Sequence, residues 1–123
     1  MRTLTDHVVE GDTAPQLTIN VLDEPGHGGA CHEYLIGWIE EPGTPVSMRV
    51  QFQNGPIKEF GVNGITETAL LAIVIDRLRS FQTGPFACNS NLLALRKVDD
   101  ALFLLQGRTR DRIACGVEWT SNA

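Results

Sequence analysis

The sequence lacks the features that mark membrane, secreted and disulfide-rich proteins. Its longest apolar run, ALLAIVI at residues 69–75, is far shorter than the roughly 20 residues that a membrane-spanning helix needs. The first residues, MRTLTDHVVEGD, contain no apolar core, so a secretory signal is not expected. Cys31, Cys88 and Cys115 are odd in number, and their spacing suggests no disulfide framework. These absences favour a reducing cytoplasm and give no reason to expect a role in a membrane.

Motifs that would indicate an enzyme or a metal site are also missing. No Ser/His/Asp arrangement stands in a recognisable catalytic context. His27, Cys31 and His32 in the run HGGACH invite a metal interpretation, but zinc usually takes four ligands in paired short spacings, and here a second pair is absent. We therefore expect no catalytic residue and no metal site, and a flexible glycine-rich loop. A phosphodiesterase-like activity that uses His27 or His32 with an acidic residue stays as the enzymatic alternative.

Positive charge is scarce overall and unevenly placed. The formal net charge is -5. Residues 1–65 carry 3 Lys/Arg against 9 Asp/Glu, residues 66–115 carry 7 against 5, and Glu118 supplies the remaining negative charge. Binding of duplex nucleic acid needs a broad basic face, which an acidic body does not offer. The local excess in the second half instead suits a compact anionic ligand.

Three arginines, Arg108, Arg110 and Arg112, concentrate this excess in the run QGRTRDRIACG. On a helix Arg108 and Arg112 share a face because they are four residues apart, whereas Arg110 points nearly the opposite way. Such a pair suits the fork geometry of phosphate or pyrophosphate binding. Cations in the last turns of a helix also complement its dipole, so the residues alone leave both interpretations open.

The N-terminal half has the pattern of a β-sheet. Residues 16–22, 33–39 and 45–53 read as strands, separated by turn-forming runs rich in glycine and proline. The third strand alternates apolar and polar residues, which predicts one buried face. The simplest arrangement is an antiparallel meander, and the first ~12 residues are expected to be loosely held.

The hydrophobic period changes to that of helices in the C-terminal half. Thr66 is a suitable cap for a helix over residues 66–82, and the Gly-Pro turn at 83–88 ends that helix. A second helix is expected over about residues 90–114. Phe103 and its neighbours Leu93 and Leu104 lie off its main apolar stripe, and a helix of this kind is usually covered by two neighbours.

The sequence thus predicts an α+β protein with a single domain over residues 1–123. A small antiparallel β-sheet occupies about residues 14–60, and a long antiparallel helical hairpin follows at 66–115. One neighbour of the second helix is the first helix or the sheet. The other is expected to be a second subunit, so that the protein homodimerises through the hairpin.

Two residues near the turn of the hairpin admit both a structural and a binding role. Phe81, at the end of the first helix, is a core residue by default, but a partly covered ring beside the GPF turn would stack a base. Asn91, early in the second helix, falls on its apolar stripe. A buried amide must find partners, so Asn91 either caps the turn or contacts a ligand.

The elements LLAIVIDRL, FQTGPFAC, an asparagine three residues on, and RTRDR together resemble phage proteins with the anti-CBASS/anti-Thoeris helical hairpin domain, over about residues 50–118. The strand-rich part makes the chain similar to the first Thoeris anti-defence family. The resemblance implies a sponge in the cytoplasm of the bacterial host. It would sequester a cyclic ADP-ribose isomer (glyco-cyclic ADP-ribose) made by TIR-domain sensors, without cleaving it. Capture of cyclic di- or trinucleotide CBASS signals, at the same or additional sites, is the alternative.

The resemblance also implies roles for four residues and no cofactor. Phe81 would stack the adenine, and Asn91 would make a polar contact in the same region. Arg108 and Arg112 would bind the phosphates. Arg108 follows Asn91 by 17 residues, or roughly 25 Å along a helix, which a mononucleotide-sized ligand cannot span. A second hairpin lying antiparallel would complete the site, giving two equivalent sites per two-fold dimer, and the resemblance allows dimers to assemble into a hexamer.

Overall fold

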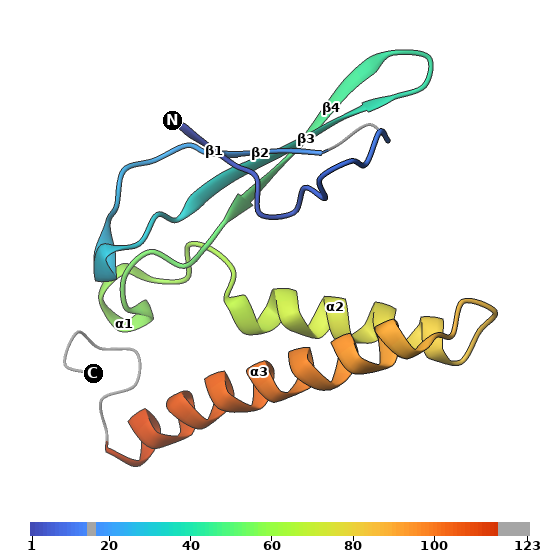
Figure 1. Ribbon diagram of the computed structural model, residues 1–123. Helices are drawn as coiled ribbons and strands as arrows, with labels where there is room; N and C mark the ends of the chain where they lie inside the picture. Colours follow the sequence, from blue (N-terminus) through green and yellow to red (C-terminus); the bar gives the residue numbers. More distant parts are fainter. Residues whose placement is uncertain (15–16, 116–123) are drawn as a thin grey trace. The chain divides into compact units, whose positions relative to one another are not determined.

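The computed structural model describes residues 1–14 and 17–115 (Figure 1). Within them, four strands come first and three α-helices follow, which confirms the α+β class predicted from the sequence. By their internal contacts the residues form two compact units. The β unit comprises Met1–Gly55 and Phe60–Gly64, and the helical unit comprises Pro56–Glu59 and the chain from Ile65.

The β unit is built on one antiparallel sheet with the strand order β1-β2-β3-β4. The meander predicted from the turn signals is therefore confirmed. The predicted strand at 33–39 corresponds to β3, the one at 45–53 to β4, and the one at 16–22 to the shorter β2, with residue 16 outside the described residues. The strands are β1 (Arg2–Leu4), β2 (Thr18–Val21), β3 (Glu33–Glu40) and β4 (Thr44–Gln51).

Strand β1 corrects the expectation that the N-terminal segment is loosely held. Arg2 lies opposite Val21, and Leu4 lies opposite Ile19, in antiparallel register. Backbone groups along one edge of β2 are thereby paired, which an edge strand otherwise leaves open. A strand of three residues contains too little alternation to stand out in a sequence.

The apolar side of the sheet is organised around a row of facing residues. Val21, Tyr34 and Val50 are cross-strand neighbours on β2, β3 and β4. The ring of Tyr34 meets that of Phe52 edge to face, with centroids 5.6 Å apart. Val21 is only 1% exposed, so the small core of this unit lies beneath that row. The buried face predicted from the alternation of the third strand is the one that carries Val50.

The helical unit is an antiparallel hairpin of α2 (Glu67–Gln82) and α3 (Asn89–Ala114), after the single turn α1 (Ile57–Phe60) (Figure 1). Thr66 caps α2 as predicted, because its Oγ1 accepts a hydrogen bond from the backbone N–H of Ala69 (3.3 Å). Both long helices agree with their predicted limits. None of the described helices combines the length and apolar character that crossing a bilayer requires.

The two long helices pack through one side of each. Ile75 of α2 is 3% exposed and is joined by half-buried residues of both helices: Leu70, Leu71, Leu78, Leu95, Val98, Leu102 and Leu105. The apolar residues that lie off this stripe stay largely uncovered. Leu93, Phe103 and Leu104 are 45%, 65% and 70% exposed. The outward side of α3 thus carries three large apolar side chains, among exposed charged ones, that this chain's own hairpin does not bury.

Candidate ligand-binding site

The turn between α2 and α3 is closed by side chains from both helices. The backbone N–H of Cys88 donates to Gln82 Oε1 (3.1 Å). The Cys88 side chain caps α3 by accepting a hydrogen bond from the backbone N–H of Asn91 (3.5 Å). Gly84 and the following proline interrupt the helical pattern between them. These contacts fix where the end of α2 and the start of α3 stand relative to each other.

Asn91 takes part in this closure. Its Nδ2 donates to the carbonyl oxygen of Phe86 (3.3 Å), so the amide holds the backbone of the turn. Of the two roles that the sequence allowed, the structural one is therefore present. Its Oδ1 accepts no hydrogen bond from any described residue, and this acceptor remains available for a donor outside the chain.

Phe81 lies at the same end of the hairpin and is half-buried. Its ring meets that of Phe86 at 82°, with centroids 6.4 Å apart. The guanidinium of Arg77 lies over the Phe81 ring, 5.1 Å from its centroid. Phe81 and Asn91 both contact Phe86, so the structure brings two of the four expected site residues together. We call Arg77, Phe81, Phe86 and Asn91 the turn-end cluster.

Sequence reasoning missed two members of the turn-end cluster. Arg77 precedes Phe81 by four residues on one helix, which is the spacing at which side chains meet on a helix surface. That signal was present in the sequence. Phe86 lies in the turn itself, where no periodic pattern gives the direction of a side chain.

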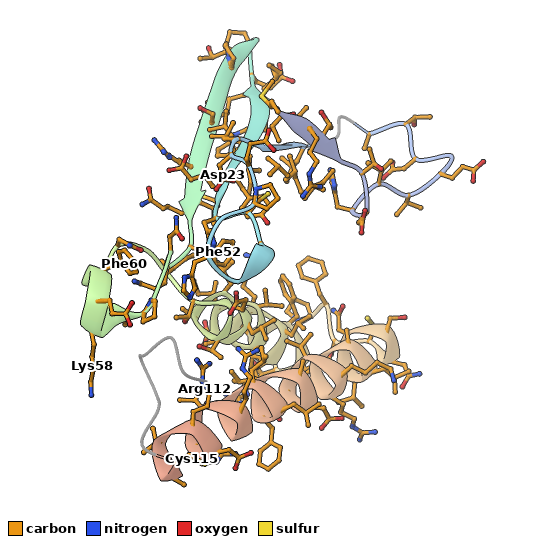
Figure 2. All side chains as sticks on the ribbon, turned by 90° about the vertical axis from the view of Figure 1, so that its left-hand side faces the viewer. Asp23, Phe52, Lys58, Phe60, Arg112 and Cys115 are labelled. Atoms are coloured by element: carbon orange, nitrogen blue, oxygen red, sulfur yellow. The ribbon has the colours of Figure 1, made fainter. Side chains whose placement is uncertain are left out.

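The expected phosphate-binding residues lie near the other end of α3. Arg108 is exposed and Arg112 is half-buried, and both come from the last turns of the helix. Figure 2 labels Arg112 and Cys115 at the C-terminal end of α3. Arg110 is separate from this pair, because its guanidinium lies 5.2 Å from the centroid of the exposed Phe103 ring. We call Arg108 and Arg112 the arginine pair.

One chain does not bring the turn-end cluster and the arginine pair together. Asn91 is the third residue of α3, and Arg108 follows 17 residues later. At about 1.5 Å per residue, their backbones are roughly 25 Å apart along the helix axis. The hairpin therefore carries a candidate aromatic and amide half-site at one end and a candidate cationic half-site at the other.

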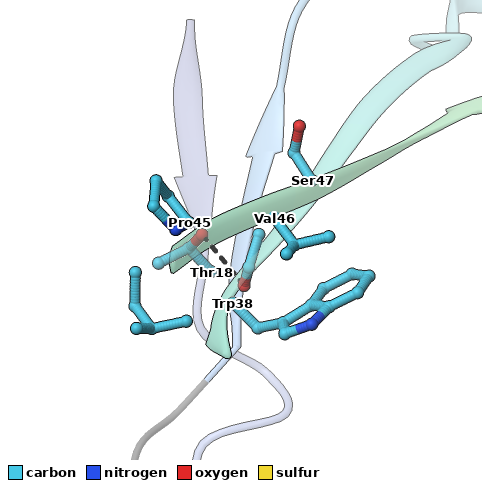
Figure 3. A pocket seen from close by; sticks show the side chains of 7 residues that line it. Thr18, Trp38, Pro45, Val46 and Ser47 are labelled. Atoms are coloured by element: carbon cyan, nitrogen blue, oxygen red, sulfur yellow. Dashed lines mark hydrogen bonds between the residues drawn. The ribbon is translucent and has the colours of Figure 1, made fainter. Parts of the chain in front are cut away.

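The β unit contains a separate pocket of about 300 Å³ (Figure 3). It lies at one end of the sheet and is lined by Thr18, Gly37, Trp38, Ile39, Pro45, Val46 and Ser47. Thr18 Oγ1 donates to the carbonyl oxygen of Gly37 (3.4 Å), and a Cβ at Gly37 would come within 2.8 Å of that hydroxyl. No cation lines this pocket, so it offers no counter-charge to a phosphate. The hairpin is the stronger candidate for an anionic ligand.

The glycine-rich run that invited a metal interpretation is held by several hydrogen bonds. Asp23 accepts hydrogen bonds from the backbone N–H groups of His32 (2.9 Å) and Glu33 (3.2 Å). The His32 ring is buried, and its Nε2 lies 3.0 Å from the carbonyl oxygen of His27. In the described part of the chain, no three His, Cys, Asp or Glu residues come close enough to hold a metal ion.

Comparison with known proteins shows that this hairpin matches a known domain family. Residues 44–110 match the family model of the Acb2/Tad1 hairpin domain. The protein named Thoeris anti-defense 1, from Bacillus phage SBSphiJ7, is 45% identical over 71 residues. That match covers 58% of this chain and 50% of the phage protein, so the chain spans about half the length of this relative. The matched family segment includes the whole turn-end cluster and Arg108, and ends two residues before Arg112.

Proposed function

Because the chain belongs to the Acb2/Tad1 hairpin domain family, we propose that it is a phage anti-defence protein that sequesters a nucleotide-derived immune signal. The name of its phage relative supports an action against Thoeris defence. The signal that we assign is a cyclic ADP-ribose isomer, glyco-cyclic ADP-ribose, made by TIR-domain sensors. The place of action is the cytoplasm of the bacterial host.

The observation that carries this proposal is the division of the hairpin into two complementary half-sites. The aromatic ring of Phe81 suits a purine, because flat rings stack with favourable dispersion and quadrupole interactions. The free oxygen of Asn91 suits a donor such as an exocyclic amine. Arg108 and Arg112, four residues apart on one helix, suit the two phosphates of a pyrophosphate. A base and a pyrophosphate are the two recognisable parts of an ADP-ribose ligand.

The separation of the half-sites requires a second copy of the chain. Two hairpins packed antiparallel about a two-fold axis would bring the turn-end cluster of one protomer to the arginine pair of its partner, at two equivalent places. The exposed outward residues Leu93, Phe103 and Leu104 supply the apolar surface that such a contact needs. Further association of dimers into a hexamer, a trimer of dimers, would leave this site unchanged.

The proposed mechanism is capture at equilibrium, without catalysis. Sequestration lowers the free signal below the threshold of its receptor only if binding is tight and the protein is abundant. A site enclosed between two subunits favours slow release, and differences in affinity among related complexes arise mainly from the dissociation rate. Binding and release of the signal require no nucleophile, general base, metal ion or cofactor.

A calorimetric panel tests the proposal directly. The protein would be titrated with cyclic ADP-ribose isomers and with cyclic di- and trinucleotides. The bound compound would then be released by heating and identified. We expect tight binding of glyco-cyclic ADP-ribose and its recovery intact. Cleaved signal would establish an enzyme instead of a sponge, and binding of cyclic oligonucleotides alone would favour the CBASS-type alternative, to which the family's double name also points.

A further inference from the structure

Arg77 is the one charged residue in the turn-end cluster. It lies one helical turn before Phe81, and its guanidinium carbon is 5.1 Å from the centroid of the Phe81 ring. Within residues 1–14 and 17–115, the Arg77 guanidinium forms no ion pair with a carboxylate. Its contact with the ring therefore does not depend on an acidic partner. A guanidinium over an aromatic face is attracted by the negative potential of that face.

The position of Arg77 determines how Phe81 meets a ligand. A cation on one face of the ring excludes a base from that face. It also lowers the negative potential on the opposite face, which reduces the repulsion between the ring and the π electrons of a stacked purine. The edge-to-face contact with Phe86 at 6.4 Å restrains the same ring from a second direction. One ring thus has two protein neighbours and a restricted choice of stacking face.

We propose that Arg77 is a positioning residue for base recognition, which covers one face of Phe81 and presents the other face to the purine of the ligand. This role rests on the proposed function and adds a residue to its site. Arg77 acts through the ring and not as a phosphate ligand, since the phosphates are assigned to the arginine pair of the partner protomer. Under this proposal, Arg77 and the arginine pair have two different tasks.

Substitution of Arg77 separates charge from packing. Arg77→Met keeps an apolar stem over the ring and removes the cation, whereas Arg77→Lys keeps the cation. Arg79→Met is the matched control, because Arg79 lies on the same helix and is exposed. With glyco-cyclic ADP-ribose as the probe, we expect Arg77→Met to weaken binding by about threefold to tenfold. Arg77→Lys should recover most of that loss, and Arg79→Met should bind as the unmodified protein does.

A double-mutant cycle with Phe81→Leu identifies the route of the effect. If Arg77 acts through the ring, Arg77→Met should cause no further loss of affinity once Phe81 is replaced. Inorganic pyrophosphate, which has no base, provides a second readout. Its ability to compete for the site should be the same with Arg77→Met as without it. Thermal unfolding of each variant reports whether the hairpin is intact.

The outcomes distinguish this inference from the proposed function. Failure of the unmodified protein to bind any cyclic ADP-ribose isomer overturns the proposed function and removes the basis for this role. Normal binding by the unmodified protein and equally by Arg77→Met overturns the role of Arg77 alone. Additive losses in the cycle would overturn an action of Arg77 through the ring, and weaker competition by pyrophosphate would show that Arg77 contacts the ligand phosphates itself.

Discussion

At the scale of single residues, the arginine pair gives the most direct test of the binding site. Arg108 is exposed, so Arg108→Ala should leave folding nearly unchanged. Loss of a hydrogen-bonded cation on a phosphate costs about 1.5–3 kcal/mol, so the Kd for glyco-cyclic ADP-ribose should rise by roughly tenfold to a hundredfold. Arg79→Ala is the control, because Arg79 is an exposed arginine on the other helix of the hairpin. Unfolding by Arg108→Ala with affinity preserved would favour a structural role in complementing the helix dipole.

Asp23 allows a residue-scale prediction about acid stability. The backbone N–H of His32 is the main cause that holds the pKa of the Asp23 carboxyl below its ordinary value of 3.8. Because the pKa of Asp23 is lower in the folded state, its carboxylate stabilises the fold at every pH above the pKa of the unfolded state. This stabilisation is lost as the pH falls through the pKa of the folded state. The stability of the protein should therefore fall below about pH 4.

Asp23→Asn isolates that contribution. The asparagine keeps an acceptor oxygen and loses the titrating charge, so the variant should be less stable than the parent near neutral pH. The difference in Tm between the two proteins should shrink as the pH is lowered from 6 to 3. Thermal unfolding followed by circular dichroism measures the Tm of each protein at each pH. A constant difference across this range would mean that the hydrogen bonds to Asp23 do not depend on its charge.

The residues of the site were only partly predictable from the sequence. The periodicity of the helices placed Phe81 and Asn91 near one end of the hairpin and the arginines near the other. It did not find the contact of Arg77 with Phe81 or of Asn91 with the carbonyl of Phe86. The first contact follows a four-residue spacing on one helix, which the sequence does contain, whereas the second depends on the path of the turn, which helical spacing does not fix.

At the scale of elements, the length of each helix or strand decided whether it could be predicted from the sequence. The helices α2 and α3 contain several turns of apolar periodicity and end at recognisable caps, so their limits agree with the prediction. The strand β1 and the helix α1 have three and four residues. An element of that size spans about one period of its own pattern, and pairing with a neighbour decides whether it forms.

The turn between the long helices offers a prediction at this scale. Asn91→Ala removes the hydrogen bond from Nδ2 to the carbonyl of Phe86, so the free energy of unfolding should fall by about 1 kcal/mol. Ligand affinity should fall as well, because the amide oxygen is lost. Asn89→Ala is the control, since Asn89 is an exposed residue at the start of the same helix. Urea denaturation and calorimetry measure the two effects. Unchanged stability with weaker binding would limit Asn91 to the ligand role.

At the scale of the whole molecule, the separation of the two candidate half-sites predicts that two chains assemble to form one binding site. The exposed apolar residues on the outward side of α3 and the roughly 25 Å along α3 between Asn91 and Arg108 are independent observations. The first is what the proposed contact with a second hairpin would use. The second indicates that a ligand touching both ends must meet two hairpins. An antiparallel pair would satisfy both, and under the proposed function it would convert two incomplete half-sites on each chain into two complete sites on the dimer.

Complementation between two variants with weakened binding tests that assembly. Phe81→Ala damages the turn-end cluster and Arg108→Ala damages the arginine pair, so each homodimer has two defective sites. In a hybrid dimer, one site combines both defects and the other combines an intact Phe81 with an intact Arg108. Random exchange of subunits in an equal mixture makes half of the dimers hybrid, so about a quarter of the sites should regain full affinity. Calorimetric stoichiometry after co-refolding measures that fraction. If the mixture binds no better than either variant alone, Phe81 of one protomer and Arg108 of its partner do not bind the same ligand molecule. That result would contradict a site shared between two chains.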